Sequence, residues 1–140
     1  MQIKRVKTRE ELKVVFNIRK AVFVLEQGVP IEDEFDEHED YAEHVLVYYN
    51  NKPAGTGRLR EVDGAGKLER ICVLASYRKL GLGKIIVTSL EKIAHDKDLQ
   101  RVKLHGQTQA EEFYTRLGYQ RSSDIFIEDG IPHVLMTKIL

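Results

Sequence analysis

The spacing of hydrophobic residues changes along the chain, and each change marks a boundary between predicted elements. Apolar positions within residues 3–6 indicate a short first strand. Thr8 and Glu11 then form a capping-box pattern that starts a helix. Its apolar face runs over residues 12–23, and it is predicted to end before Pro30.

Three strands and a second long helix follow. The β-prone runs are bounded by turn signals, which is typical of an antiparallel meander. Helical spacing then returns, before a further strand, a short helix and two closing strands. The predicted strands cover 45–49, 54–62, 67–74, 102–104, 125–127 and 134–139, and the predicted helices cover 82–95 and 110–117. The resulting order is β-α-β-β-β-α-β-α-β-β. It predicts an α/β (α+β) domain over residues 1–140, with a mixed, mostly antiparallel sheet and helices on both faces.

Composition narrows the class of protein further. The 140 residues are 42% hydrophobic and 31% charged, as expected for one globular domain. The 22 acidic and 22 basic residues cancel, so neither a nucleic acid nor a membrane is an expected partner. A single cysteine allows no disulfide within the chain, and no apolar run has the length of a signal peptide or a bilayer span. A cytoplasmic location is expected.

The most informative stretch joins the meander to the second long helix. Residues 78–84, RKLGLGK, read as a glycine loop at a helix start, with cations beside it. Unpaired amides and the partial positive charge of a helix N-terminus favour a phosphate or pyrophosphate. A P-loop would need glycine at Arg78 and Ser or Thr at Ile85, and a dinucleotide fingerprint would need glycine at Ile86. By itself, the glycine pair would fit a plain turn equally well.

Two motifs together resemble the GNAT acetyltransferase superfamily. The first is Arg78-x-x-Gly81-x-Gly83, and the second is Ala110-x-x-Phe113-Tyr114-x-x-x-Gly118-Tyr119. Their order, their separation and the order of predicted elements match the GNAT fold along essentially the whole chain. Segments 22–27 and 128–133 are similar to small stand-alone bacterial members of the ElaA/YjcF type.

The resemblance implies acetyl-CoA as cosubstrate. In the family, the strand before the loop pairs with the pantetheine arm, the loop amides bind the pyrophosphate, and the amide at the position of Val73 can stabilise the thioester oxygen. Many relatives have asparagine where this chain has Gln107, whose side chain has a different reach. The residues implied to contact the cofactor are Ile71, Cys72, Val73, Arg78, Lys79, Leu80, Gly81, Leu82, Gly83, Lys84, Gln107, Phe113 and Tyr114.

Tyr114 occupies the position of the family's common general acid, where a phenol protonates the leaving thiolate. It also lies on an apolar helix face, as a core tyrosine would. Glu69 is the first candidate for the general base, because strand alternation predicts that it shares a face with Ile71 and Val73. His133 is the second candidate and His105 the third, since imidazole titrates near neutral pH.

The implied activity is transfer of an acetyl group to a primary amine by direct attack in a ternary complex. Cys72 lies in an apolar strand without a neighbouring base and is expected to be a core residue rather than a nucleophile. The alternative is a CoA-binding or interaction module with the same fold and no catalysis. Oligomeric state stays open, although the family includes many dimers.

An acidic run covers residues 32–43, in the region that helps to form the family's acceptor pocket. Its eight acids would attract a cationic amine, or would form a solvated loop. The spacing of His38, Asp40 and His44 matches neither a zinc motif nor an EF-hand, so no metal is expected.

The sequence also suggests environments for three arginines. Arg19, on the apolar helix face, is expected to pair with Glu26 or an acid of the run, or to line the acceptor pocket. Arg58 and Arg60 share one strand face and are expected to be solvated.

Overall fold

The computed structural model describes the whole chain, residues 1–140, and confirms the predicted order of elements. The structure adds a short helix, a π-helix at Lys20–Glu26 and a two-residue strand. The α-helices are α1 (Arg9–Arg19), α2 (Ile31–Glu34), α3 (Leu82–Asp96) and α4 (Glu111–Arg116). The strands are β1 (Gln2–Arg5), β2 (Glu43–Tyr49), β3 (Lys52–Val62), β4 (Ala65–Val73), β5 (Arg101–Gln107), β6 (Gln120–Arg121), β7 (Phe126–Glu128) and β8 (Ile131–Ile139).

The strands form one mixed sheet in the order β1-β2-β3-β4-β5-β8-β6, with β7 paired to β8. Only β4 and β5 run parallel, and every other pair is antiparallel. The chain reaches the parallel pair through α3, because a parallel connection needs a crossover. The sheet is therefore mostly antiparallel, as the sequence predicts.

Three tight turns fix the register of the hairpins. The turn residues are Asn50–Asn51, Asp63–Gly64 and Asp129–Gly130, and all six have positive φ, between 50° and 77°. Two-residue turns of this kind match the twist of the flanking strands and favour Asn, Asp and Gly. Each turn lies where the sequence signals a break between strands.

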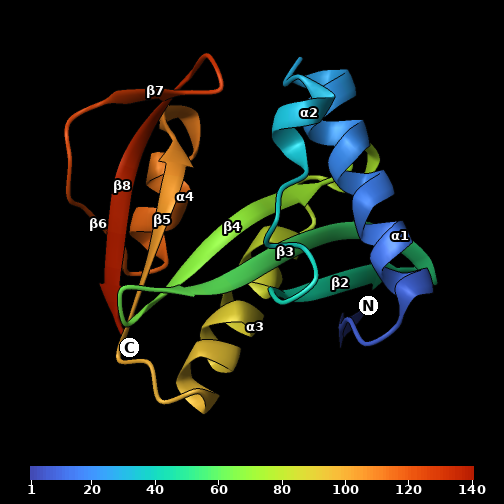
Figure 1. The fold of residues 1–140 in the computed structure, drawn as a ribbon, viewed down its shortest axis with the longest axis horizontal. Helices are drawn as coiled ribbons and strands as arrows, with labels where there is room; N and C mark the ends of the chain where they lie inside the picture. The colour runs from blue at the N-terminus through green and yellow to red at the C-terminus, as the bar shows by residue number, and fades with distance from the viewer.

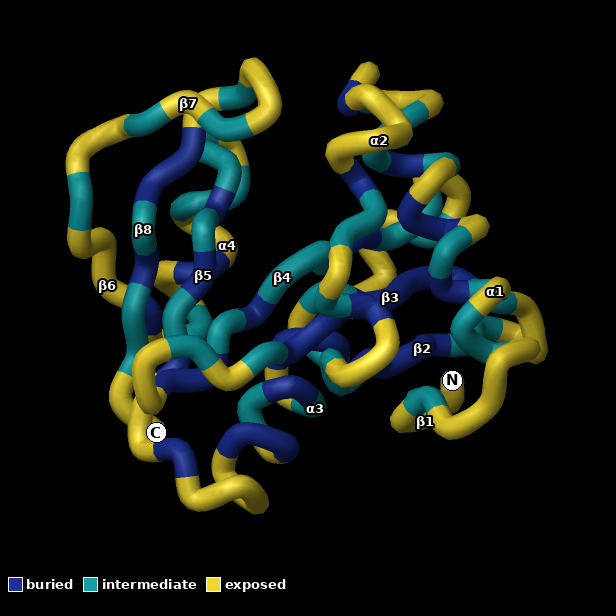
Figure 2. The backbone as a smooth tube through the Cα atoms, in the orientation of Figure 1, coloured by how far each residue is buried: buried dark blue, intermediate teal, exposed yellow.

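Helices cover both faces of the sheet. On one face, α3 supplies Ile86 and Leu90 to the main hydrophobic cluster of 18 buried residues. A Cβ atom at Gly57 of β3 would lie 2.6 Å from Ile86, so glycine is required for this close approach. On the other face, α1 and the π-helix pack a smaller buried cluster with β2 and β4, whose members are Val15, Ile18, Val22, Leu46 and Cys72. Figure 2 shows burial concentrated along the central strands, with exposed hairpin tips.

The sheet opens between its two halves. Figure 1 shows β4 turning away from β5 and β8, while α1 and α2 lie over the β2–β4 half. No helix is long and apolar enough to cross a membrane. No group of three or more His, Cys, Asp or Glu side chains is arranged to hold a metal ion.

Candidate active site

The parallel pairing of β4 and β5 ends early. Only Gly66–Leu68 pair with Val102–Leu104, although β4 continues to Val73 and β5 to Gln107. Beyond Leu68, β4 remains paired with β3, and β5 remains paired with β8. The facing edges of β4 and β5 therefore carry backbone groups without a strand partner, which can pair with an extended ligand.

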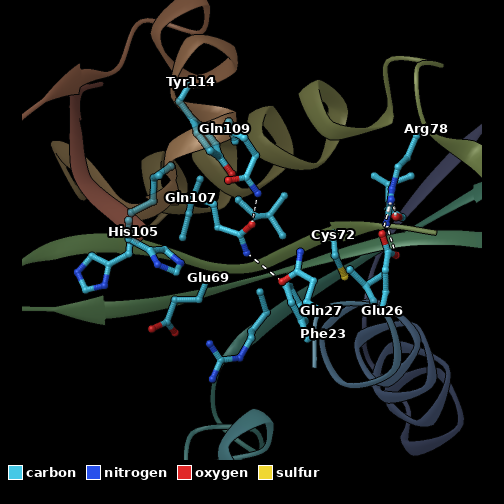
Figure 3. A pocket seen from close by; sticks show the side chains of 18 residues that line it. Phe23, Glu26, Gln27, Glu69, Cys72, Arg78, His105, Gln107, Gln109 and Tyr114 are labelled. Carbon is cyan, nitrogen blue, oxygen red and sulfur yellow. Dashed lines mark hydrogen bonds and ion pairs between the residues drawn. The ribbon is translucent and has the colours of Figure 1, made fainter. Parts of the chain in front are cut away.

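A cavity of about 490 Å³ lies where the strands diverge, and it is called the β4–β5 cavity below. The π-helix forms one wall, and β4, β5 and α4 form the others (Figure 3). Its lining residues are Val22, Phe23, Glu26, Gln27, Leu68, Glu69, Arg70, Ile71, Cys72, Val73, Arg78, Leu104, His105, Gln107, Gln109, Ala110, Tyr114 and His133. It brings the three candidate bases and Tyr114 to one place.

A second cavity, of about 360 Å³, adjoins the glycine loop. Gly81 precedes α3 with φ 82°, a left-handed conformation that glycine adopts without strain, and no side chain caps the helix. The first-turn amides of a helix have no intrahelical partner, so they can bind an anion. The residues lining this cavity are Val73, Tyr77, Arg78, Lys79, Gly81, Leu82, Gly83, Lys84 and Phe113. These groups fit a pyrophosphate.

Gly83 serves packing as well. A Cβ atom there would lie 3.2 Å from Cζ of Phe113, so the absent side chain lets α4 approach the first turn of α3. Phe113 is 36% exposed and lines the same cavity. The two sequence motifs thus meet in space at this point.

Arg78 has partners of its own within the chain. Its guanidinium donates to both carboxylate oxygens of Glu26, each at 2.7 Å, and its Nε donates to the Val73 carbonyl at 3.0 Å. Glu26 lies at the end of the π-helix, so this pair joins the helix to the glycine loop. A pyrophosphate in the loop would compete with Glu26 for Arg78.

A chain of glutamines crosses the β4–β5 cavity. Gln107 Nε2 donates to Oε1 of Gln27 at 3.0 Å, and Gln109 Nε2 donates to Oε1 of Gln107 (Figure 3). The chain connects the end of the π-helix with the end of β5. Gln107 therefore lines the cavity, but its amide is held by the protein's own side chains.

Tyr114 extends from α4 toward the cavity (Figure 3). It is also a core residue, with edge-to-face contacts to Phe113 and Tyr119 at centroid distances of 5.0 and 5.8 Å. Burial raises the pKa of its phenol, which therefore stays protonated at neutral pH. Tyr114 therefore lies both in the hydrophobic core and at the cavity, the two placements that the sequence left open.

Cys72 is a core residue, as predicted. Its side chain is 6% exposed and belongs to the smaller cluster beneath α1. Burial raises the pKa of the thiol, so the nucleophilic thiolate is strongly disfavoured.

Glu69 does not share a face with Ile71 and Val73, contrary to the alternation expected from the sequence. Arg58 pairs with Glu69, but Thr56 pairs with Cys72, so β4 contains an extra residue at a bulge. Arg70 within this bulge has φ 55°. The side chain of Glu69 therefore points to the face that carries α2.

The Glu69 carboxylate is already paired with three cations. Arg58 and Arg60 donate to Oε1 at 2.8 and 2.7 Å, and Lys67 Nζ lies 3.2 Å from Oε2. Burial would raise the pKa of Glu69, but the hydrogen bond from Arg60 and these charges hold it well below its usual range. A carboxylate stabilised in this way is a weak proton acceptor.

The two histidines lie on the neighbouring strands β5 and β8, and both line the cavity. His133 is buried, and its Nδ1 lies 2.7 Å from the Ile131 carbonyl. His105 Nδ1 lies 2.9 Å from Oε1 of Glu128. Glu128 was not among the residues selected from the sequence, because only the β7–β8 hairpin places it here.

The acidic run is neutralised by buried arginines, and Arg19 pairs with two of its acids rather than with Glu26. Arg19 is fully buried and donates to both oxygens of Glu39 at 2.7 Å and to Glu34 at 2.9 Å. Arg58 is also buried and donates to Asp36 at 2.9 and 3.0 Å. We call Arg19, Glu34, Asp36, Glu39, Arg58 and Glu69 the acid–arginine network.

The expectation that Arg58 and Arg60 are solvated is wrong. Arg58 is 1% exposed and Arg60 pairs with Glu69, so neither is a simply solvated arginine. Both share a strand face, but the acidic run folds over that face and supplies carboxylates to it. Half of the run is exposed, namely Glu32, Asp33, Glu37 and Asp40, and these side chains do not line the β4–β5 cavity.

The sequence predicts a helix that ends before Pro30, but it does not predict that the second half, Lys20–Glu26, is a π-helix. Such helices are rare and often occur at functional sites. Here the π-helix places Val22, Phe23 and Glu26 on the cavity wall, and Gln27 follows directly after it. The resemblance of segment 22–27 to bacterial relatives was the only sign in the sequence that this segment belongs to the site.

Sequence comparison shows the family to which this fold belongs. The family described as "Acetyltransferase (GNAT) domain" matches residues 7–140. The chain belongs to the GNAT family of acetyltransferases.

Similar proteins place it among small bacterial members. Bacillus subtilis YyaT, described as uncharacterised, is 57% identical over 99% of this chain and 95% of its own. YjcF of the same organism, described as an uncharacterised N-acetyltransferase, is 50% identical over 94% of this chain and 95% of its own. The crystal structure of Escherichia coli ElaA has a TM-score of 0.87 at 23% identity, covers 99% of both chains, and shows the same fold.

Proposed function

We propose that this protein transfers an acetyl group from acetyl-CoA to a primary amine by direct attack. The observation that carries the proposal is the unpaired edge of β4, which runs from the β4–β5 cavity to the uncapped start of α3. This path offers backbone groups to an extended arm and amides to a pyrophosphate. Acetyl-CoA has both parts and supplies the activated thioester.

The binding residues follow from the two cavities. The edge at Ile71–Val73 would pair with the pantetheine arm, and the amides from Arg78 to Lys84 would hold the pyrophosphate, with Lys79 and Lys84 adding positive charge. Phe113 would cover the arm near the start of α3. The amide of Val73 would donate to the carbonyl oxygen as negative charge develops on it.

Proton transfers are assigned to residues of the cavity wall. An amine arrives protonated and must lose a proton before it attacks. We favour His133 over Glu69 as the acceptor, because Glu69 is paired with Arg58, Arg60 and Lys67. Tyr114 keeps its proton at neutral pH and would give it to the leaving sulfur. The buried thiol of Cys72 supports direct transfer rather than an acyl-enzyme.

The acidic run suggested a cationic acceptor, but the charges that line the cavity do not favour one. Its lining contains Glu26 and Glu69, balanced by Arg70 and Arg78. The buried acids of the run already pair with arginines. The acceptor is therefore proposed to be recognised at its amine and by the apolar wall of Val22 and Phe23, rather than by a strong negative field.

The test is to follow free thiol while the protein, acetyl-CoA and a panel of primary amines are mixed. Turnover with at least one amine is expected, and Tyr114→Phe should lower kcat by about 100-fold, as removal of a general acid does. Tyr49→Phe, at a residue that lines neither cavity, should leave kcat unchanged. Binding of acetyl-CoA without turnover of any amine would instead indicate a CoA-binding module.

A further inference from the structure

His105 and His133 line the β4–β5 cavity, and one carboxylate, which does not line it, lies between their imidazoles. Glu128 is the last residue of β7 and pairs with Ile131 across the Asp129–Gly130 turn. The same hairpin pairs Phe126 with His133. Because β8 also pairs with β5, the ends of three strands bring Glu128, His105 and His133 together.

The contacts within this group are close. Glu128 Oε1 lies 2.9 Å from His105 Nδ1, and Oε2 lies 3.7 Å from His133 Nε2. Phe126 contacts both rings, with centroid distances of 5.0 Å to His105 and 6.0 Å to His133. The carboxylate and the phenyl ring therefore hold the two imidazoles in fixed orientations.

These contacts determine where the protons lie. A carbonyl oxygen can only accept, so His133 Nδ1 must donate to Ile131, and Nε2 of the neutral ring carries a lone pair. The hydrogen bond from His105 and the nearby charges lower the pKa of Glu128 against the opposing effect of burial. Glu128 is then a carboxylate, so His105 Nδ1 donates to it and its Nε2 is also free to accept.

We propose that Glu128 is a positioning residue for proton removal from the amine, acting through His133 and His105. This proposal rests on the acetyltransferase function above. His133 Nε2 takes one proton from the ammonium group, and the carboxylate of Glu128 stabilises the resulting imidazolium. The free amine forms the C–N bond, the C–S bond breaks, a second amine proton replaces the one that Tyr114 gives to sulfur, and His133 releases its proton to solvent.

Other charged groups bear on this site from each neighbouring element. Lys67 and Glu69 on β4 pair with each other, and the charge of Lys67 contributes to the lowered pKa of Glu128. His105 lies on β5, and Tyr114 reaches the cavity from α4. Of the carboxylates near this site, Glu128 is the one that contacts the histidines. A test of the proposal therefore removes the charge of Glu128.

The first test compares Glu128→Gln with Asp129→Asn. Each removes one negative charge from the same hairpin, and asparagine tolerates the positive φ of residue 129. In Glu128→Gln, we expect kcat to fall about 10-fold and the acid limb of kcat/KM for the amine to move about half a unit or more to lower pH. KM for acetyl-CoA should change less than about twofold. Asp129→Asn should match the wild type, and an unchanged kcat and acid limb in Glu128→Gln would overturn the proposal.

A second measurement does not depend on turnover. NMR titration of the imidazole C–H signals should give lower midpoints for His105 and His133 in Glu128→Gln than in the wild type, and unchanged midpoints in Asp129→Asn. Equal midpoints in all three proteins would overturn the role of Glu128. A wild type that turns over no amine would overturn the acetyltransferase proposal, while the titration would still decide whether Glu128 acts on the histidines.

Discussion

Two regions of this molecule gather charged and polar groups, and they differ in whether those groups already have partners. In the acid–arginine network, the buried guanidinium groups of Arg19 and Arg58 are satisfied by carboxylates. Along β4 and at the start of α3, backbone groups face a cavity without a strand partner or a cap. The high-charge region is therefore expected to stabilise the fold, and the less conspicuous backbone edge is expected to bind the ligand.

Removing Arg58 from the acid–arginine network should give the largest effect, a loss of stability. Arg58→Met leaves Asp36, Glu39 and Glu69 without their shared cation, and breaking a buried pair costs about 3–5 kcal/mol. Thermal unfolding should show a fall in Tm of about 10 °C or more. Arg116→Met is the control, because Arg116 and its partner Glu112 are both largely exposed. A loss below about 1 kcal/mol would show that the network is not a stabilising element.

The pH dependence of stability should also show that the acid–arginine network stabilises the fold. Burial would raise the pKa of Asp36, but the hydrogen bond and charge of Arg58 lower it to about 2. A lowered carboxyl pKa stabilises the fold above about pH 4, and this contribution is lost as the pH falls through about 2. Asp36→Asn should therefore be less stable at pH 7 by about 2 kcal/mol, with the difference shrinking below pH 4.

Urea unfolding of the wild type and Asp36→Asn at several pH values measures this difference. Asp40→Asn, in an exposed acid of the same run, provides the control and should track the wild type throughout. A difference between the wild type and Asp36→Asn that stays constant from pH 7 to pH 3 would contradict the assignment.

In the region proposed to bind the ligand, a substitution at Gly81 should weaken the binding of acetyl-CoA by more than its loss of stability explains. Gly81→Ala forces alanine into the left-handed region at φ 82°, which costs about 1–2 kcal/mol and disturbs the amides before α3. KM for acetyl-CoA should rise about 10-fold. Gly64→Ala is a close control, because Gly64 has φ 77° and, like Gly81, open space around it.

The Gly64 control should lose similar stability without any change in KM. Chemical denaturation and steady-state kinetics on both variants make the comparison. Equal KM values for the two variants would mean that the loop before α3 does not bind the cosubstrate.

The smallest effect is expected at the pair that joins the two sides of the cavity. Glu26→Gln removes the carboxylate that competes for Arg78, and exposed pairs of this kind contribute about 0–1 kcal/mol. KM for acetyl-CoA should fall by about two- to threefold, as measured by initial rates. Glu43→Gln, which loses the surface pair with Arg5, should not change it. An increase in KM for Glu26→Gln would show that Glu26 supports the loop instead.

The sequence predicts the local parts of this fold well. Turn residues such as Asn50–Asn51, the capping box at Thr8 and the helical spacing after Leu82 act through near neighbours, and the structure contains each of them. The glycine loop and Tyr114 were found because both belong to motifs with defined spacing.

Non-local effects explain what the sequence could not predict. The bulge at Arg70 shifts the face of Glu69, and strict alternation cannot foresee an extra residue. The burial of Arg58 depends on an acidic run about 20 residues earlier folding over its strand. Glu128 reaches the histidines only through the pairing of β5, β7 and β8.

The contrast between the two regions is tested most directly by NMR titration of backbone amides with acetyl-CoA. The largest shifts should fall on Ile71–Val73 and on residues 78–84, along β4 and at the start of α3. The amides of Glu34, Glu39 and Arg58, in the acid–arginine network, should change little. Shifts centred on the network, or no shifts along β4 and α3 at saturating acetyl-CoA, would contradict the assignment of the cleft.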